Sequence, residues 1–353
     1  MYIVAAILAF GILIAVHELG HFLVAKACGV KVNEFSVGMG PAILKKQRGE
    51  TLYSLRCLPI GGYCAMEGED ADTGDARAFT VQPAWKKALI LVAGAAMNFL
   101  LGLLVVIILY AGAQGFVGTK VVSTADGFKY GGESGLEAGD VIYSINGART
   151  YYSSDFLNYM DRYGGDSGVK MVVVRGGQKV TLGNYQLQPA YYTDSDGNQV
   201  YRYGVNFNFI EPTVGAKLKY SFYTSWNFVR VVWMGLSDLV TGAAGVKDLS
   251  GVVGIVTTIN QVGEQSATKA DAWANIAYLC AFIAVNLAVM NLLPIPALDG
   301  GRLFFVVVDW IISLFVHHAV NPKYEAYVHA AGLVVLLGFM AYVMYNDIAR
   351  LIR

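Results

Sequence analysis

Two histidines and a glutamate near the N-terminus have the spacing of a metal site. His17, Glu18 and His21 form the pattern His-Glu-x-x-His within an apolar stretch of helical length. Residues four apart on an α-helix lie on one face, one turn apart, so both imidazoles can bind the same ion. Neutral imidazole nitrogens suit Zn²⁺. Glu18 lies beside the ion by the same geometry, and we predict that it acts as a general base.

A catalytic zinc site needs a third protein ligand and one open position. We predict that Asp299 is this ligand, in the sequence Asn-Leu-Leu-Pro-Ile-Pro-Ala-Leu-Asp-Gly-Gly that begins at Asn291. The two prolines break a long apolar segment, and the Gly-Gly pair permits a sharp turn. In the alternative interpretation, Asp299 only caps the helix that begins at Gly300. Asp309 is a weaker candidate on an otherwise apolar helix.

The composition indicates a membrane protein with several spans. Of the 353 residues, 55% are hydrophobic and 15% are charged, whereas about a quarter of the residues in soluble domains are charged. The net charge is zero and no long basic run is present, which excludes a nucleic acid as partner. A charge near the bilayer centre costs about 2.5–3.5 kcal/mol on insertion scales, so ionisable groups there are usually functional.

Four stretches are long enough to cross the bilayer, which takes about 20 helical residues. They are residues 1–25, 89–113, 276–293 and 327–345. The basic residues between 26 and 88 predict, by the positive-inside tendency, that this loop is cytoplasmic and that the N-terminus is outside. Residues 114–270 are then expected outside as well.

These segments predict four parts. Residues 1–113 form a first membrane half with a β-rich loop at 27–88, and residues 114–212 form a small α+β module of short strands with one helix. Residues 213–270 form amphipathic linker helices, and residues 271–353 form a second membrane half. The predicted fold is a polytopic α-helical membrane protein with four transmembrane helices and one external α+β domain. His317, His318 and His329 are interpreted as polar residues at the membrane interface.

Four features together resemble the site-2 protease family of intramembrane zinc metalloproteases, of the bacterial RseP (regulator of sigma-E protease) type. They are the His-Glu-x-x-His pattern, the sequence GAAMNF at 94–99, the Asn-Leu-Leu-Pro-Ile-Pro-Ala-Leu-Asp-Gly-Gly segment, and a stretch at 134–147 similar to a PDZ signature. The resemblance covers nearly the whole chain. It implies that His17, His21 and Asp299 bind zinc, with Glu18 as the general base.

The resemblance also implies a setting and substrates. Family members lie in the bacterial cytoplasmic (inner) membrane, with the PDZ-like domain on the outer side. They cut transmembrane segments of single-span proteins, such as anti-sigma factors after a first cleavage, or remnant signal peptides. The expected partners are therefore transmembrane protein substrates and the lipid bilayer.

Further positions are similar to substrate contacts of the family. Gly38, Met39 and Gly40 resemble the edge of a membrane-reentrant β-element that pairs with substrate as an added strand, which would satisfy the backbone groups of an unwound helix. The alternative is a simple amphipathic hairpin. Asn291 resembles an asparagine that binds the substrate backbone, whereas Asn98 is either a substrate contact or a helix–helix contact.

The external module resembles a PDZ domain with a permuted carboxylate-binding loop. Tyr203, Gly204 and Val205 are similar to that loop, whose backbone N–H groups would receive a peptide C-terminus. One such module is recognised in this chain, whereas the enterobacterial protein has two.

Two other classes of function compete with the protease. A membrane-bound PDZ scaffold with a vestigial metal site is disfavoured because both histidines, the glutamate and the aspartate are all present. A transporter would also have polar residues and broken helices within the membrane. The chain shows no inverted repeat and has few spans, which argues against that class.

Overall fold

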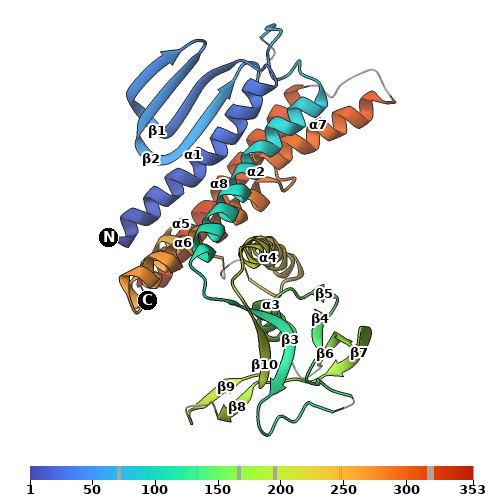
Figure 1. Ribbon diagram of the computed structural model, residues 1–353. Helices are drawn as coiled ribbons and strands as arrows, with labels where there is room; N and C mark the ends of the chain where they lie inside the picture. Colours follow the sequence, from blue (N-terminus) through green and yellow to red (C-terminus); the bar gives the residue numbers. More distant parts are fainter. Residues whose placement is uncertain are drawn as a thin grey trace. The chain divides into compact units, whose positions relative to one another are not determined.

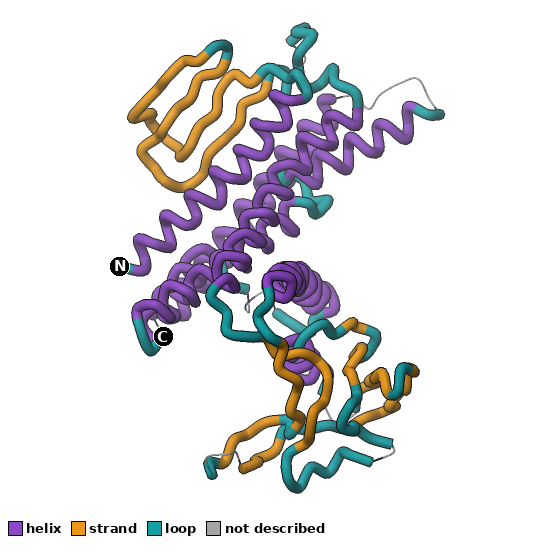
Figure 2. Tube along the Cα trace, in the orientation of Figure 1, coloured by secondary structure: helices purple, strands orange, loops and turns teal. Residues whose placement is uncertain are grey.

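The computed structural model describes residues 1–69, 73–132, 134–164, 168–193, 197–245, 247, 249–315 and 322–352. The chain divides into two compact units (Figures 1 and 2). The first unit comprises Met1–Leu109 and Thr224–Arg353, and the second comprises Tyr110–Tyr223. The predicted module at 114–212 lies inside the second unit.

Within the described part of the chain, four helices are long and apolar enough to cross a membrane. They are α1 (Tyr2–Ala27), α2 (Ala84–Ala111), α6 (Lys269–Asn291) and Tyr327–Leu351 within α8 (Pro322–Ile352). Each contains or overlaps one of the predicted spans, so the prediction of four transmembrane helices is confirmed. The helix that contains most of the third predicted span, α6, ends at Asn291, and a separate helix, α7 (Asp299–Ser313), follows it.

Small residues let α2 approach both α1 and α6. A Cβ on Gly20 of α1 would lie within 2.8 Å of the Ala93 carbonyl carbon on α2. A Cβ on Gly102 of α2 would lie 2.9 Å from the Ala281 oxygen on α6. Because lipid gives apolar helices no hydrophobic reason to associate, such close backbone contacts are a main source of packing energy. The glycines therefore place α2 against both neighbours.

The β-rich loop forms a compact sheet beside α1 (Figure 1). It consists of β1 (Val32–Arg48) and β2 (Thr51–Met66), which pair antiparallel with several register shifts. Glu34–Val37 pair with both Leu52–Leu55 and Gly62–Ala65, while Leu44–Arg48 pair with Thr51–Leu55. In the pairing of the described residues, the run from Gly62 to Met66 therefore has a neighbour on one side only.

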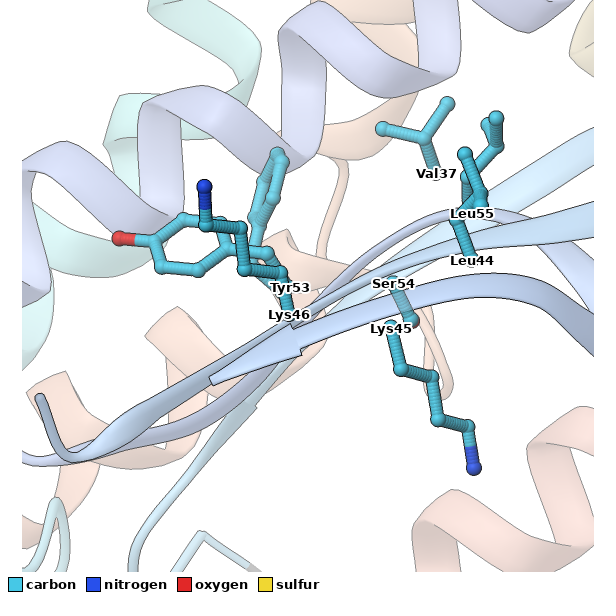
Figure 3. A pocket seen from close by; sticks show the side chains of 8 residues that line it. Val37, Leu44, Lys45, Lys46, Tyr53, Ser54 and Leu55 are labelled. Atoms are coloured by element: carbon cyan, nitrogen blue, oxygen red, sulfur yellow. The ribbon is translucent and has the colours of Figure 1, made fainter. Parts of the chain in front are cut away.

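Aromatic rings attach this sheet to α1. Phe22 of α1 lies 5.1 Å from Phe35 and 5.9 Å from Tyr53, measured between ring centroids. A cavity of about 530 Å³ lies against the sheet and is lined mainly by apolar side chains. Figure 3 shows Val37 and Leu55 on the opposite side of the strands from Lys45. None of the predicted site residues lines this cavity.

One arginine connects the strands of the sheet. The Arg56 guanidinium donates to Glu34 at 2.7 Å, to the Ser36 hydroxyl at 3.0 Å and to the Gly40 carbonyl at 2.7 Å. It also donates to the hydroxyl of Tyr63, which belongs to the edge run Gly62–Met66. Five fixed N–H donors allow arginine to serve several partners at once. The sheet is thus linked by side chains as well as by its backbone.

The second unit is built mainly from short strands, together with one helix. The sheet order is β10-β3-β4-β6-β7, with β5 on β4, and β8 and β9 form a separate hairpin. Its elements are β3 (Phe116–Thr124), β4 (Val141–Ile145), β5 (Ala148–Arg149), α3 (Ser153–Tyr163), β6 (Val169–Arg175), β7 (Gln178–Tyr185), β8 (Ala190–Thr193), β9 (Gln199–Arg202) and β10 (Val205–Ile210). Gly204, which has φ +70°, separates β9 from β10.

The predicted linker helices are α4 (Val214–Thr241) and α5 (Val252–Gln265). A buried carboxylate from α8 caps the start of α5. Asp347 is 3% exposed, and its Oδ2 accepts the N–H groups of Gly251 at 2.9 Å and Gly254 at 2.8 Å. The first N–H groups of a helix have no partner within the helix and favour a nearby negative charge. Asp347 therefore fastens α5 to α8.

We expect Asp347→Ala to loosen the start of α5. The change leaves two N–H groups without their acceptor, at a cost of about 1–3 kcal/mol for each that stays buried. Hydrogen exchange measured by mass spectrometry should become faster in the peptide that contains residues 251–256. Asp347→Asn keeps an acceptor oxygen and should exchange more slowly than the alanine variant. Unchanged exchange in Asp347→Ala would show that this cap does not hold the helix.

Candidate metal centre

Three of the predicted site residues converge on one point. His17 and His21 come from α1, and Asp299 is the first residue of α7. Asp299 Oδ2 lies 3.0 Å from His17 Nε2 and 3.2 Å from His21 Nε2. The two Nε2 atoms are 3.1 Å apart. One ligand atom from each residue thus lies within 4.8 Å of the others.

The donor atoms fit a metal ion. Asp299 Oδ2 is buried and has no hydrogen-bond partner among the described residues. An oxygen in that state is costly unless a cation or a proton satisfies it. Two imidazole nitrogens and one carboxylate oxygen, with room for a fourth ligand, are a donor set of catalytic zinc sites.

Atoms of α2 orient both histidines. His21 Nδ1 lies 2.8 Å from the Ile90 carbonyl, which can only accept, so Nδ1 carries the proton and Nε2 is left free for a metal. Asn98 is 1% exposed and lies 3.4 Å from His17 Nδ1, and its Oδ1 has no hydrogen-bond partner among the described residues. The amide atom at this distance is Nδ2, which can only donate, and a half-turn of the amide would bring Oδ1 to His17 Nδ1 instead. In that orientation His17 Nδ1 donates and Nε2 is left free in the same way.

A glycine of α2 makes room for the two rings. A Cβ on Gly94 would lie 2.8 Å from His17 Nε2 and closer still to His21 Nε2. Only a hydrogen atom fits at that position. As part of GAAMNF, Gly94 is a feature of the family resemblance, which does not by itself assign it this role. The signal was available, because Gly94 and Asn98 are four apart and therefore share a helix face.

Glu18 lies in a cavity together with the three converging residues. The cavity has a volume of about 590 Å³ and is also lined by Tyr63–Met66 of β2 and by the segment from Ala297 to Arg302. A Cβ on Gly62 would lie 3.5 Å from the Glu18 Cγ. Glu18 therefore lies between the metal ligands and the edge run of β2.

The break between α6 and α7 brings Asp299 to this cavity. Pro294 and Pro296 lack an N–H, which ends the α6 hydrogen-bond pattern after Asn291. A Cβ on Gly301 would lie 2.9 Å from the Ile295 carbonyl carbon, so α7 begins tightly against the broken segment. The capping residue is Leu298, whose side chain makes no capping hydrogen bond. The interpretation of Asp299 as an N-cap is therefore wrong.

An ion pair that the sequence analysis did not find joins α7 to the loop after β2. Arg302 donates to Glu69, and Glu69 also accepts the Met66 N–H at 3.3 Å. Glu67, two residues before Glu69, accepts hydrogen bonds from Lys31 at 2.8 Å and from Asn33 at 3.0 Å. These hydrogen bonds, above all the one from Lys31, lower the pKa of Glu67 to about 2, so it stays charged near neutral pH. The loop is thereby attached at the cavity wall.

Several predicted substrate contacts lie elsewhere. Gly38 and Gly40 have φ of +84° and +81° and flank Met39, which pairs with Leu58. Asn291 is the last residue of α6. None of these residues lines the cavity. Their contact with substrate stays a prediction, whereas the part of the sheet that does line the cavity is Tyr63–Met66.

The predicted peptide-binding loop lies in the second unit. The Tyr203 hydroxyl donates to Asp161 on α3 at 2.8 Å, and Val205 pairs with Thr124 of β3. A Cβ on Gly204 would lie 2.6 Å from the Tyr192 ring. The ring of Tyr192 thus covers one side of the loop.

We expect Gly94→Ala to abolish stoichiometric zinc binding, because the added methyl group occupies the space of both imidazoles. Zinc content of the purified protein, measured by atomic emission, should fall by at least about tenfold. The matched control is Gly338→Ala on α8, where a Cβ meets nothing within 4 Å. Full zinc content in Gly94→Ala would mean that the close approach of α2 does not limit the site.

Known proteins similar to this chain indicate its family. The model of peptidase family M50 matches residues 5–339. A protein of Clostridium perfringens whose name classes it as a zinc metalloprotease is 37% identical, over 99% of this chain and 98% of its own length. The regulator of sigma-W protease RasP of Bacillus subtilis is 26% identical, over 99% of this chain and 98% of its own length.

A match over almost the whole chain, with similarity to full-length zinc metalloproteases, identifies the family. The four apolar helices agree with a multi-pass membrane protein. The chain is therefore a zinc-dependent intramembrane metalloendopeptidase and belongs to peptidase family M50, the site-2 proteases.

Proposed function

We propose that this protease cuts transmembrane segments of single-span proteins at a centre formed by His17, His21, Asp299 and Glu18. The observation that carries the proposal is the shared cavity, which brings the three candidate ligands and Glu18 next to an edge run of β2. His17, His21 and Asp299 hold the metal. Bound there, zinc supplies a Lewis acid that polarises a carbonyl and lowers the pKa of water.

Glu18 is the general base in this proposal. It follows His17 directly on α1, lines the same cavity and is not part of the ligand group. A carboxylate in that position can take the proton from the attacking water and pass it to the leaving amine. In this proposal Ile90 and Asn98 act on the histidines and not on the substrate. The Ile90 carbonyl holds His21 in the tautomer that leaves Nε2 free, and Asn98 does the same for His17 when its Oδ1 faces Nδ1.

The edge run Gly62–Met66 is proposed to receive the substrate. A helix must unwind before its peptide bond can be cut, and its freed N–H and C=O groups need partners inside the membrane. An unpaired strand edge supplies such partners by strand addition. Tyr63–Met66 line the cavity, and the described pairing leaves one side of the run open. In this proposal the added strand lies beside Glu18, in a membrane-reentrant β-element.

The proposed substrates are of the anti-sigma-factor type after a first cleavage, or remnant signal peptides. The name of the Bacillus subtilis relative, a regulator of sigma-W protease, supports the first class. We further propose a bacterial inner-membrane location with the second unit on the outer side as a PDZ-like domain. Its loop Tyr203-Gly204-Val205 would take peptide C-termini or screen bulky substrates.

We expect Glu18→Gln to retain zinc and to cleave a single-span substrate about 10²–10⁴-fold more slowly, because the proton acceptor is lost while the ligands stay. Asp299→Ala should lose zinc as well as activity. Asp309→Ala serves as the control, since it removes a carboxylate of the same helix that is outside the ligand group. Zinc content and cleavage are measured on the purified proteins in detergent. Wild-type cleavage by Glu18→Gln would exclude this mechanism and favour a scaffold with a vestigial site.

Strand addition predicts a specific pattern of cross-links. In a Glu18→Gln background without native cysteines, Ala65→Cys should form disulfides with cysteines placed along the unwound part of a substrate. Leu44→Cys lies in the run on the far side of the sheet, is exposed as leucine, and should not cross-link. Equal cross-linking at both positions, or none at residue 65, contradicts the proposed edge. Preferential cross-linking at residues 38–40 would instead support the glycine-rich turn.

A further inference from the structure

His329 on α8 contacts the backbone of the broken segment. Its Nδ1 accepts the Ala297 N–H at 3.0 Å. A backbone amide can only donate, so Nδ1 is unprotonated and the ring proton is on Nε2. The interpretation of His329 as a polar residue at the membrane interface stays a prediction, and the structure adds a backbone partner for its ring. His317 and His318, which were interpreted in the same way, lie outside the described residues.

Ala297 has a backbone conformation that alanine rarely adopts. Its φ is +78°, and it occupies the third position of a turn in which the Leu298 N–H donates to the Ile295 carbonyl at 3.2 Å. Proline at the second position and a positive φ at the third are features of a type II turn, where glycine is the usual third residue. A residue with a Cβ stays in this region only when its surroundings hold it there.

The surroundings that hold Ala297 come from α7 and α8. A Cβ on Gly332 would lie 3.1 Å from the Pro296 oxygen, so α8 touches the turn directly. His329 is one helical turn away from Gly332 and faces the same segment. The His329 ring also packs on Phe305 of α7 at 5.4 Å between ring centroids, with an angle of 64° between the planes.

We propose that His329 is a positioning residue for the metal centre. Its hydrogen bond keeps Ala297 in the left-handed conformation, and this sets the direction in which the chain enters α7. Asp299 follows two residues later, and its Oδ2 must reach both histidine Nε2 atoms at 3.0 and 3.2 Å. A change of φ at Ala297 would turn Leu298 and Asp299 away from them. The inference rests on the proposed ligand set.

Two substitutions distinguish the role of the His329 hydrogen-bond acceptor from the role of its aromatic ring. His329→Phe keeps the aromatic ring on Phe305 but has no acceptor. His329→Asn loses the ring but has an oxygen at the same number of bonds from the backbone as Nδ1. A third change, Ala297→Gly, removes the steric reason why the turn needs an external hydrogen bond. Combined with His329→Phe, it should restore the site if the turn is what His329 controls.

The readouts are the zinc dissociation constant, from chelator competition on the purified full-length protein, and the visible absorption of the cobalt(II)-substituted protein. We expect His329→Phe to weaken zinc binding about tenfold or more, the size usual for groups behind metal ligands, and to alter the cobalt spectrum. His329→Asn and the double variant Ala297→Gly/His329→Phe should stay within about threefold of the wild-type constant. Circular dichroism of the metal-free proteins confirms that each variant is folded.

Wild-type zinc affinity and cobalt spectrum in a folded His329→Phe would overturn the proposal. Equal loss in His329→Asn and His329→Phe would also overturn it, since the ring and not the acceptor would then matter. Failure of Ala297→Gly to improve the phenylalanine variant would exclude control through the turn. Asp299→Ala is measured alongside, because retention of zinc by that variant rejects the ligand set itself and not the role of His329.

Discussion

The proposed metal centre depends on how closely α2 can approach α1. The rings of His17 and His21 occupy the space where a side chain at Gly94 would begin, and Gly20 lets the α1 backbone approach that of α2 at the neighbouring Ala93. This close approach brings the Ile90 carbonyl and Asn98 within reach of the two Nδ1 atoms. α2 contributes no atom to the ligand group, yet it determines which nitrogen each histidine can offer. In a bilayer, where burying apolar surface gives helices little reason to associate, such contacts between small residues are how the arrangement is kept.

The second requirement is a way to bring a carboxylate to the histidines from a distant part of the chain. In a continuous helix Asp299 would lie beyond the two histidines. Instead, the helix is broken at Pro294 and Pro296, and α7 begins after the break. A break inside a membrane leaves backbone groups that need partners. Local turns and the side chain of His329 supply partners for several of them. The broken segment also forms one wall of the cavity. The residues that position the Asp299 carboxylate therefore also shape the space proposed for substrate.

Much of this could be read from the sequence, because it depends on local patterns. Helical spacing predicts that His17 and His21 share a face, apolar length predicts the four spans, and two prolines before Asp299 predict a broken helix. Contacts between distant segments carry no such pattern. Nothing in the sequence around His329 shows that it lies against Ala297, or that Glu69 binds Arg302. The glycine-rich turn at 38–40 illustrates the same limit, since the register shifts of β1 and β2 decide which run lies beside the cavity.

The Arg56 network has a consequence for the energetics of substrate capture. Arg56 binds Glu34 and Ser36 in the central run Glu34–Val37 and Tyr63 in the edge run Gly62–Met66. The edge run is therefore held to the sheet before any substrate arrives. A template that is already ordered loses little conformational entropy when a second strand joins it, and the entropic cost falls mainly on the incoming chain. Selection would then depend on how readily a substrate helix unwinds. Segments rich in glycine, proline or other weak helix formers would be captured most easily.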